Sequence, residues 1–417
     1  MVLAILCFVY VLNFLDRQLL SILAKPIQDD LGITDGQIGK ISGLYFALFY
    51  CLISIPVAWF ADRTNRVRVV SVACALWSAA TIACGFAATY PQLVGARMSV
   101  GIGEAGGVPP SYAIISDYFP PGKRGTALGF YNLGPPIGQA LGVAFGASIA
   151  ASYNWRSAFV ALGAVGVVTA LGVVFAVREP SRGGLDGLAA PTTRPAAREG
   201  FLATCRMFFT RPVLVLVALA TGATQFITYA TLNFATLFLM REKGMTLQEI
   251  ALWYALLVGI CIGGGIFIAG RLTDRWVPHD KRAYAWIPGI ALLVAVPPFL
   301  GFVWAPTWPL AMLFLAAPMA LNYFYLSPAV ALVQEAVRPD QRVMAGALLL
   351  LVMNLIGLGL GPTYLGAASD YFRAMHPGHS LQFAFYTLAP FYLLAALLFA
   401  ALARALRREQ LSDGDTA

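Results

Sequence analysis

Apolar residues fill long stretches of this chain, and polar residues collect in short intervals between them. A helix needs about 20 predominantly apolar residues to cross a hydrocarbon core roughly 30 Å thick. Twelve such stretches occur, at about 1–24, 38–60, 67–88, 91–116, 125–150, 156–177, 212–240, 247–270, 283–303, 308–334, 343–369 and 381–403. The pattern therefore predicts an all-α membrane protein with twelve transmembrane helices.

Composition excludes the soluble classes. With 59% hydrophobic and 12% charged residues, the chain has too little polar surface to cover a water-soluble globule. Its three histidines fall in loops, where they assemble no nucleophile, base and orienting group, so an enzyme is not expected. His376 and His379 form an H-x-x-H pair without a third ligand. We expect neither a metal nor a cofactor.

The distribution of basic residues predicts the orientation, because loops on the cytoplasmic side carry the excess of Lys and Arg. If the N-terminus lies inside, few of the 28 basic residues fall in outer loops, namely Lys25, Lys40, Arg156, Arg241, Lys243 and Arg373. Both termini are then cytoplasmic, in a bacterial inner membrane or its equivalent. The net charge of +8 reflects this topology and not a nucleic-acid surface. The first apolar stretch is too long for a cleavable leader and contains charges.

The longest polar stretch divides the helices six and six. We predict an N-terminal bundle at 1–177, a cytoplasmic linker at 178–211 with a surface helix near 201–209, a C-terminal bundle at 212–403 and a cytoplasmic tail at 404–417. Signals repeat between the halves, which indicates two parallel repeats with a cavity near the midplane.

Two kinds of repeated signal have expected roles. After the second and eighth helices, carboxylates and arginines can form contacts that break when the halves rock, or they can be solvated loop charges; this predicted gate comprises Asp62, Arg63, Arg66, Asp274 and Arg275. In the fifth and eleventh helices, glycine and proline allow kinks and close helix approach, at Gly134, Pro135, Gly138, Gly361 and Pro362.

Charged residues also occur inside the apolar segments. Asn13, Asp16 and Arg17 can share one face of the first helix, and Arg97 and Glu104 lie two turns apart in the fourth. Each buried charge costs roughly 2.5 to 3.5 kcal/mol, so such residues usually mark a transport path. Asp16 could pair with Arg97, or Arg17 with Glu104. The cluster is either a coupling and head-group site, with Asp16 or Glu104 as proton carrier, or a permanently paired structural network.

Prolines follow the fourth-helix charges. Pro109 and Pro110 are expected within the same helix as Glu104, where they either free carbonyl groups toward the cavity or bend the helix.

Uncharged polar residues provide the remaining cavity candidates. They are Tyr131 and Asn132 in the first half, and Gln225, Tyr229, Asn233, Asn322, Tyr323 and Asn354 in the second. A cavity charged on one wall and lined elsewhere by aromatic rings and amides fits an amphipathic solute with an anionic or zwitterionic head. Many of these side chains could instead face lipid or neighbouring helices.

These residues carry a family resemblance. The D-R-x-x-R pattern from Asp62, the R-x-x-x-G-x-G pattern from Arg97 and the G-P-x-x-G pattern from Gly134 resemble signatures of the major facilitator superfamily. Within it the chain resembles the spinster group, through residues 13–17, 25–27, 97–105, 117–119, 124–125 and Tyr131. It departs from the first signature at Ala58 and Asn65. The resemblance implies a transporter similar to exporters of lysophospholipids and sphingoid lipids.

The sequence thus predicts an alternating-access secondary transporter of a lipid-like or amphipathic organic anion, coupled to protons. One alternative is a proton-coupled symporter of a small organic acid. From another class, a passive lipid scramblase or a non-transporting sensor would fit. The expected partners are the substrate, protons and the lipid bilayer, without nucleic acid. A monomer suffices, since one chain encloses the whole cavity.

Overall fold

The computed structural model describes residues 1–61, 63–181, 201–338 and 341–414, and these ranges contain helices and no strand. Eleven helices in them are long and apolar enough to cross a membrane. The remaining predicted span, at 91–116, is present as two shorter helices. The prediction of an all-α, twelve-span protein is confirmed.

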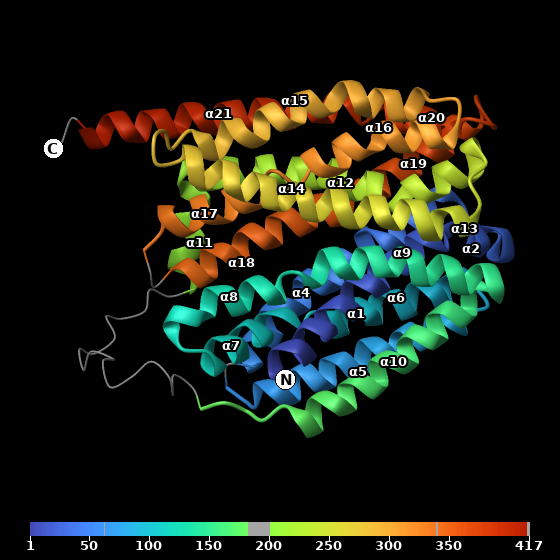
Figure 1. Ribbon diagram of the computed structural model, residues 1–417, viewed down its shortest axis with the longest axis horizontal. Coiled ribbons are helices and arrows are strands. Elements are labelled where there is room, and N and C mark those ends of the chain that lie inside the picture. Colours follow the sequence, from blue (N-terminus) through green and yellow to red (C-terminus); the bar gives the residue numbers. More distant parts are fainter. Residues whose placement is uncertain (62, 182–200, 339–340, 415–417) are drawn as a thin grey trace. The chain divides into compact units, whose positions relative to one another are not determined.

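The chain forms two compact units. Unit 1 comprises Met1–Thr193 with Met245–Gly259, and unit 2 comprises Arg194–Gly244 with Ile260–Ala417. The helices of unit 1 (Figure 1) are α1 (Val2–Ile22), α2 (Ala24–Leu31), α3 (Asp35–Ser42), α4 (Leu44–Ala61), α5 (Arg66–Gly85), α6 (Tyr90–Glu104), α7 (Val108–Tyr118), α8 (Pro121–Tyr131), α9 (Gly134–Ser152), α10 (Trp155–Ala176), α13 (Leu247–Glu249), the π-helix η1 (Ile250–Tyr254) and the start of α14 (Ala255–Trp276).

Unit 2 holds the rest of α14 and the other helices. These are α11 (Phe201–Thr210), α12 (Pro212–Lys243), α15 (Ala283–Trp304), α16 (Trp308–Leu321), α17 (Leu326–Ala336), α18 (Arg342–Met353), the π-helix η2 (Asn354–Leu360), α19 (Gly361–Arg373), α20 (Ser380–Tyr386) and α21 (Ala389–Gly414). A helix is present near the predicted 201–209, as α11, and its Phe208 side chain is buried. Residues 182–200 of the predicted linker lie outside the described ranges.

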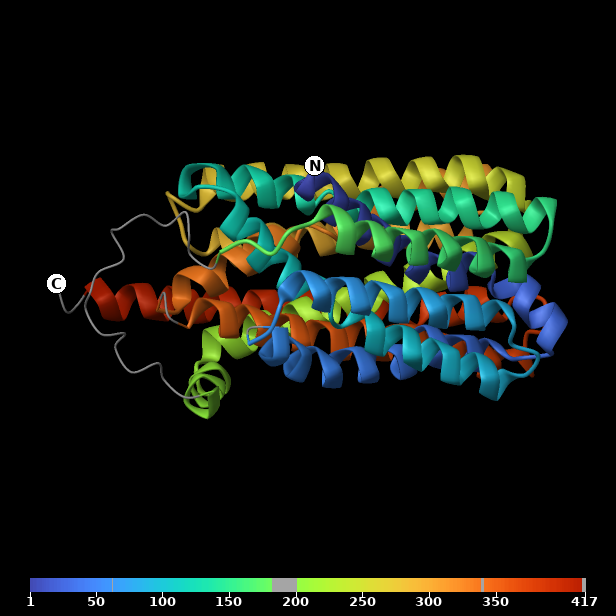
Figure 2. The same ribbon diagram turned by 90° about the horizontal axis from the view of Figure 1, so that it is seen from below.

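Glycine brings the helices of unit 1 close together. Helix α5 packs along α10, as both views show (Figures 1 and 2), and α1 packs along α9. A methyl group added at Gly138 of α9 would collide with the backbone of Val11 and lie 2.9 Å from the Phe14 side chain. The predicted close approach at Gly138 is therefore present. Gly361 has the same role in unit 2, where it lies against the backbone of Phe226 on α12.

The fourth predicted span is interrupted, which corrects the expectation of one continuous helix. Helix α6 ends at Glu104, and α7 begins at Val108. Between them the chain turns with short-range bonds, from the Gly107 amide to the Glu104 carbonyl at 3.1 Å and from the Gly106 amide to the Gly103 carbonyl at 3.2 Å. Because Pro109 and Pro110 lack amide hydrogens, α7 can begin there but α6 cannot continue through them. Glu104 is thus the last residue of a helix in the middle of a span.

A second interruption lies in the fifth span. Helix α8 ends at Tyr131, and α9 begins at Gly134 with Pro135 in its first turn. In the matching span of unit 2, η2 precedes Gly361 and Pro362. The predicted kinks at the two Gly-Pro pairs are therefore seen as a helix break and a π-helix.

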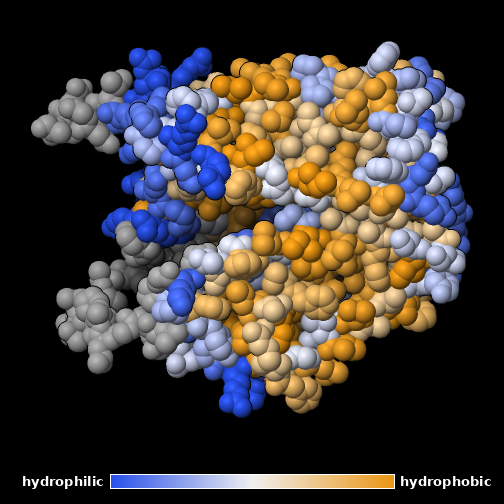
Figure 3. Space-filling view, in the orientation of Figure 1, coloured by the Kyte–Doolittle hydropathy of each residue, from blue (hydrophilic) through white to orange (hydrophobic). Residues whose placement is uncertain are grey.

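Side-chain caps fix several helix starts. The Asn65 side chain accepts a hydrogen bond from the Arg68 amide at 2.8 Å and caps α5. The residue at which the chain departs from the family signature thus has a local role. On the face shown in Figure 3, apolar side chains cover the middle lengths of the helices in each unit, and hydrophilic ones gather toward the helix ends.

Candidate functional site

The centre of unit 1 holds a buried ion pair between α1 and α6. Arg97 Nη1 donates to Asp16 Oδ2 at 2.9 Å, and the two side chains are only 2% and 1% exposed. The Thr81 hydroxyl of α5 donates to Asp16 Oδ1 at 2.8 Å. Three helices therefore meet at one carboxylate. Thr81 was not foreseen from the sequence, where it is one of many small polar residues in an apolar segment.

A second ion pair joins the same two helices. Arg17 Nε donates to Glu104 Oε2 at 2.7 Å. The Glu104 side chain is fully buried, whereas that of Arg17 is 10% exposed. Both pairings that the sequence left open are thus formed together. Glu104 is the last residue of α6, so its carboxylate extends from a helix end.

Aromatic rings surround the Arg17 guanidinium. Its Cζ atom lies 4.8 Å from the centroid of Phe14, 4.9 Å from that of Tyr50 and 5.1 Å from that of Phe46. Cation–π contacts of this kind contribute about 0.5 to 2 kcal/mol, and more when water is excluded. The rings hold Arg17 in place, and part of its side chain is exposed at the surface of unit 1.

Some buried polar atoms in this cluster have no hydrogen-bond partner among the described residues. They include Glu104 Oε1, Arg97 Nε and Asn13 Oδ1. Leaving a buried donor or acceptor unpaired costs about 1 to 3 kcal/mol. Each such group needs an explanation, which can be an ordered water, an ion or a catalytic role.

The first-half cavity candidates belong to a tyrosine cluster. Tyr131 is buried and stacks on Tyr10, with ring centroids 4.5 Å apart. The exposed Asn132 accepts a hydrogen bond from the Tyr112 hydroxyl at 2.6 Å. The sequence analysis missed Tyr10 and Tyr112. Tyr10 could have been found, since it stands three residues before Asn13 on the same helix face.

The second-half candidates lie on several helices of unit 2. Asn322 donates to the Tyr392 hydroxyl at 2.9 Å, and Asn233 donates to the Tyr229 carbonyl at 2.9 Å. Gln225 packs against Gly357 of η2 and leaves its Oε1 without a partner among the described residues. Tyr323 is buried, and Asn354 begins η2. The candidates of unit 2 are therefore uncharged polar residues, whereas the cluster of unit 1 holds paired charges.

The predicted gate is only partly described. Asp62 lies outside the described residues. Arg63 is exposed, and its Cζ atom lies 3.9 Å from the Trp59 ring centroid. Asp274 and Arg275 are exposed near the end of α14, and no ion pair within the described ranges joins them. Their role as a gate stays a prediction.

Arg66 has partners that the sequence did not reveal. Its Nη1 donates to Asp117 Oδ2 at 2.6 Å, and its Nε donates to Glu179 Oε1 at 2.8 Å. The other Glu179 oxygen accepts from the Val67 amide at 2.9 Å, at the start of α5. The network ties α5 to α7 and to the chain after α10. In unit 2, Tyr284 at the start of α15 likewise donates to Glu335 on α17, at 2.7 Å.

Replacing Arg66 with alanine is expected to lower the free energy of unfolding by about 2 kcal/mol, since two partly buried carboxylates lose their shared cation. The exposed Arg68 provides a matched control, and Arg68→Ala should stay within about 0.5 kcal/mol of wild type. Thermal unfolding of the purified variants measures both effects. Equal unfolding temperatures for the two variants would show that the network does not stabilise unit 1.

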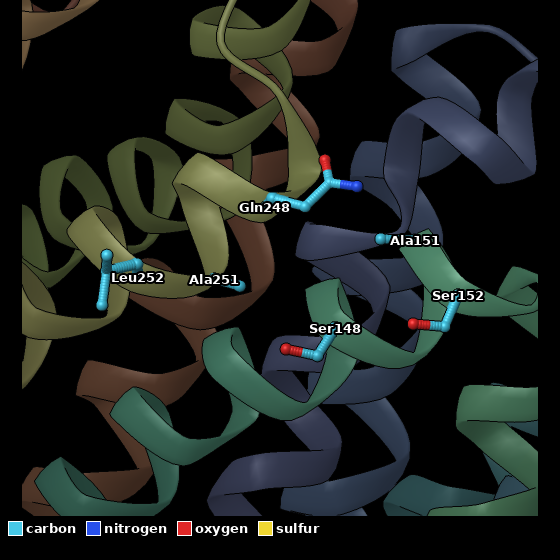
Figure 4. Close-up of a pocket in the computed structure, with 6 residues that line it drawn as sticks. All are labelled: Ser148, Ala151, Ser152, Gln248, Ala251 and Leu252. Carbon is cyan, nitrogen blue, oxygen red and sulfur yellow. The ribbon is translucent and has the colours of Figure 1, made fainter.

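A separate cavity of about 390 Å³ lies in unit 1 where α9 meets α13 and η1. Figure 4 shows Ser148, Ala151 and Ser152 on α9, and Gln248, Ala251 and Leu252 on the neighbouring segment. No charged side chain lines it, so it does not replace the ion-pair cluster as the candidate site.

The structure has membrane-spanning helices that contain paired charges, helix breaks beside those charges, and a repeated two-unit plan. Together these features define a membrane transporter. The chain belongs to the Major Facilitator Superfamily, whose family model matches residues 6–302. It is therefore a multi-pass secondary transporter of small organic molecules and not an enzyme, as the sequence predicted.

Two relatives and one solved structure show which transporters the chain is similar to. The chain is 35% identical over 368 residues to an MFS-type efflux pump of Mycolicibacterium smegmatis, covering 88% of this chain and 83% of that protein. It is 28% identical to a D-galactonate transporter of Escherichia coli over 61% of this chain and 64% of that protein. The crystal structure of a bacterial homolog of the human lysosomal transporter spinster matches with a TM-score of 0.89 and 29% identity, over 98% and 97% of the two chains. The resemblance to the spinster group is confirmed.

Proposed function

We propose that this transporter moves an amphipathic organic anion with a lipid-like tail by alternating access, and that protons drive it through the ion-pair cluster of unit 1. In this proposal Arg17 binds the anionic head group and Glu104 carries the proton. The proposal retains the predicted orientation, with both termini cytoplasmic in a bacterial inner membrane, and a monomer as the working unit.

One observation carries the head-group assignment. Of the two acid–arginine pairs, Asp16, Arg97 and Glu104 are at most 2% exposed, whereas Arg17 is 10% exposed and surrounded by aromatic rings. A guanidinium binds carboxylate or phosphate through two parallel hydrogen bonds. The rings offer apolar surface next to that charge. Arg17 is thus suited to an anionic head attached to an apolar group.

Charge balance supports the proton role. With both pairs ionised, the two carboxylates and two guanidinium groups sum to zero. An anion bound beside Arg17 would leave one excess negative charge in a poorly solvated place, which is costly. A proton on Glu104 Oε1, an atom without a partner among the described residues, would restore neutrality. Substrate and proton would then bind cooperatively.

The relatives of this chain favour two different kinds of substrate. Likeness to a spinster homolog and to an efflux pump favours an amphipathic solute. The D-galactonate transporter among the relatives favours the alternative, a proton-coupled symporter of a small organic acid. Both substrates present an anion to Arg17, so an experiment must separate them.

Uptake into proteoliposomes tests the proposal. Labelled lysophospholipid and labelled galactonate are each supplied with and without an imposed pH gradient, to wild type and to Glu104→Gln. We expect the wild type to accumulate the lipid only with the gradient. In Glu104→Gln we expect the gradient to have no effect, because the amide cannot carry a proton.

The other outcomes decide between the alternatives. Gradient-driven uptake of galactonate without lipid uptake would favour the organic-acid symporter. Lipid movement that is indifferent to both the gradient and Glu104 would mean facilitated or scramblase-like passage and would refute the proton role. Empty liposomes give the background rate.

A further inference from the structure

Helix α11 lies across the end of unit 2. It leads through Arg211 directly into α12, and it packs against α12 and α18. Figure 2 shows α11 in yellow-green and nearly end-on, whereas the long helices of unit 2 run across the view. Its 10 residues extend about 15 Å, roughly half of a hydrocarbon core. Both its direction and its length therefore suit a helix that lies along the membrane surface.

The two faces of α11 differ. Thr204 and Phe208, one turn apart, are buried against the rest of unit 2. Arg206 and Phe209 are exposed and three residues apart, so they are neighbours on the outward face. The Arg206 side chain has no hydrogen bond or ion pair within the described ranges. A basic and an aromatic side chain together on such a face are typical of helices that bind at the membrane surface.

Two further arginines are held at one helix end beside α11. Arg211 Nη1 donates to the Ala336 carbonyl at 2.7 Å, and Arg342 Nε donates to the Gln334 carbonyl at 2.9 Å. Both carbonyls belong to the last turn of α17, whose dipole supplies only about half of one negative charge. A guanidinium has several N–H groups, so both arginines retain donors for an anion.

Acidic residues do not balance this positive charge. Segments 201–211 and 326–342 contain four arginines and two carboxylates. One carboxylate, Glu335, accepts a hydrogen bond from Tyr284 at 2.7 Å, and the other, Asp340, lies outside the described residues. This end of unit 2 therefore favours an anionic partner.

We propose that the surface formed by Arg206, Phe209, Arg211 and Arg342 binds the phosphate head group of an anionic phospholipid of the surrounding bilayer. Arginine N–H groups bond phosphate oxygens well, and the exposed Phe209 ring enters the apolar region beside the head group. A soluble phosphate would leave that ring in water. The surface belongs to unit 2, so the proposal does not depend on the transport site in unit 1.

Thermal unfolding of the full chain in detergent micelles tests the proposal. Phosphatidylglycerol, which is anionic, or phosphatidylcholine, which has no net charge, is added stepwise. We expect the unfolding temperature to rise with phosphatidylglycerol and to saturate, because a ligand that binds only the folded state stabilises it. Phosphatidylcholine should have no such effect.

Arginine variants locate the bound lipid. Arg206→Gln should raise the phosphatidylglycerol concentration for half the effect by about fivefold, and Arg342→Gln should do the same. Arg68→Gln removes one exposed charge from unit 1 and should respond as the wild type does. If Arg342→Gln does not fold, Arg206→Gln decides, since the Arg206 side chain has no bond among the described residues to lose.

Binding at the transport site must be separated from binding at α11. The double variant Arg17→Gln with Glu104→Gln should keep the response to phosphatidylglycerol, whether or not the transport proposal holds. Loss of the response in this variant would place the lipid at Arg17 and overturn the inference. Equal unfolding temperatures with the two lipids, or an unchanged response in Arg206→Gln, would also overturn it. The same rise with inorganic phosphate alone would show an ion site and not a lipid-binding surface.

Discussion

Replacing Arg97 with methionine is expected to leave little folded protein. The substitution leaves the Asp16 carboxylate, which is 1% exposed, without its cation, and the Thr81 hydroxyl at 2.8 Å remains as its hydrogen-bond donor among the described residues. Removing one partner of a buried ion pair costs about 3 to 5 kcal/mol. This is a large share of a typical total stability of about 5 to 15 kcal/mol. The yield of monodisperse protein on size-exclusion chromatography and the unfolding temperature measure the loss.

A second substitution tests whether the stranded charge is the cause. In the double variant Arg97→Met with Asp16→Asn, the neutral amide oxygen can still accept from Thr81, and no unpaired charge remains buried. We expect most of the lost stability to return. Arg63→Met, at an exposed arginine, is the control for the loss of positive charge. A single variant as stable as wild type, or a double variant less stable than the single one, would contradict the account.

Replacing Arg17 with glutamine is expected to weaken binding of the transported anion by about tenfold to a hundredfold. Hydrogen bonds to charged groups contribute about 1.5 to 3 kcal/mol, and each 1.4 kcal/mol is a factor of ten in affinity. Initial uptake rates as a function of substrate concentration, in proteoliposomes, measure the change. Lys40→Gln, at an exposed lysine on α3, is the matched control and should transport as the wild type does.

Arg17→Gln also strands Glu104, so folding and transport must be separated. The double variant Arg17→Gln with Glu104→Gln has two neutral amides that can bond each other. We expect it to unfold near the wild-type temperature and still not to transport. If this variant took up substrate at half the wild-type rate or more, Arg17 would not bind the head group. The cluster would then have a structural role.

The class of this protein and the residues of its charged cluster were predictable, because both depend on the residue types within single segments. Stretches of about 20 apolar residues have few fates other than crossing a membrane, so the spans could be counted. Charges in such stretches are rare because they are expensive, which directed attention to Asp16, Arg17, Arg97 and Glu104. Helix spacing allowed the two pairings that the structure contains.

Contacts between helices distant in the sequence were not predictable in the same way. Thr81 at Asp16, Asp117 and Glu179 at Arg66, and Tyr10 against Tyr131 each depend on which helix faces join. No periodicity of a single segment contains that information. The break after Glu104 was visible as glycines and prolines, yet the same residues also fit a bent, continuous helix.

The sequence by itself therefore determined that this chain spans a membrane twelve times, belongs with the transporters and contains two acid–arginine sets. Hydrophobic transfer and the cost of buried charge act residue by residue, so they can be evaluated along the chain. Only the tertiary structure decided which charged side chains are buried and which one is partly exposed. Exposure is a property of packed helices and not of any one of them.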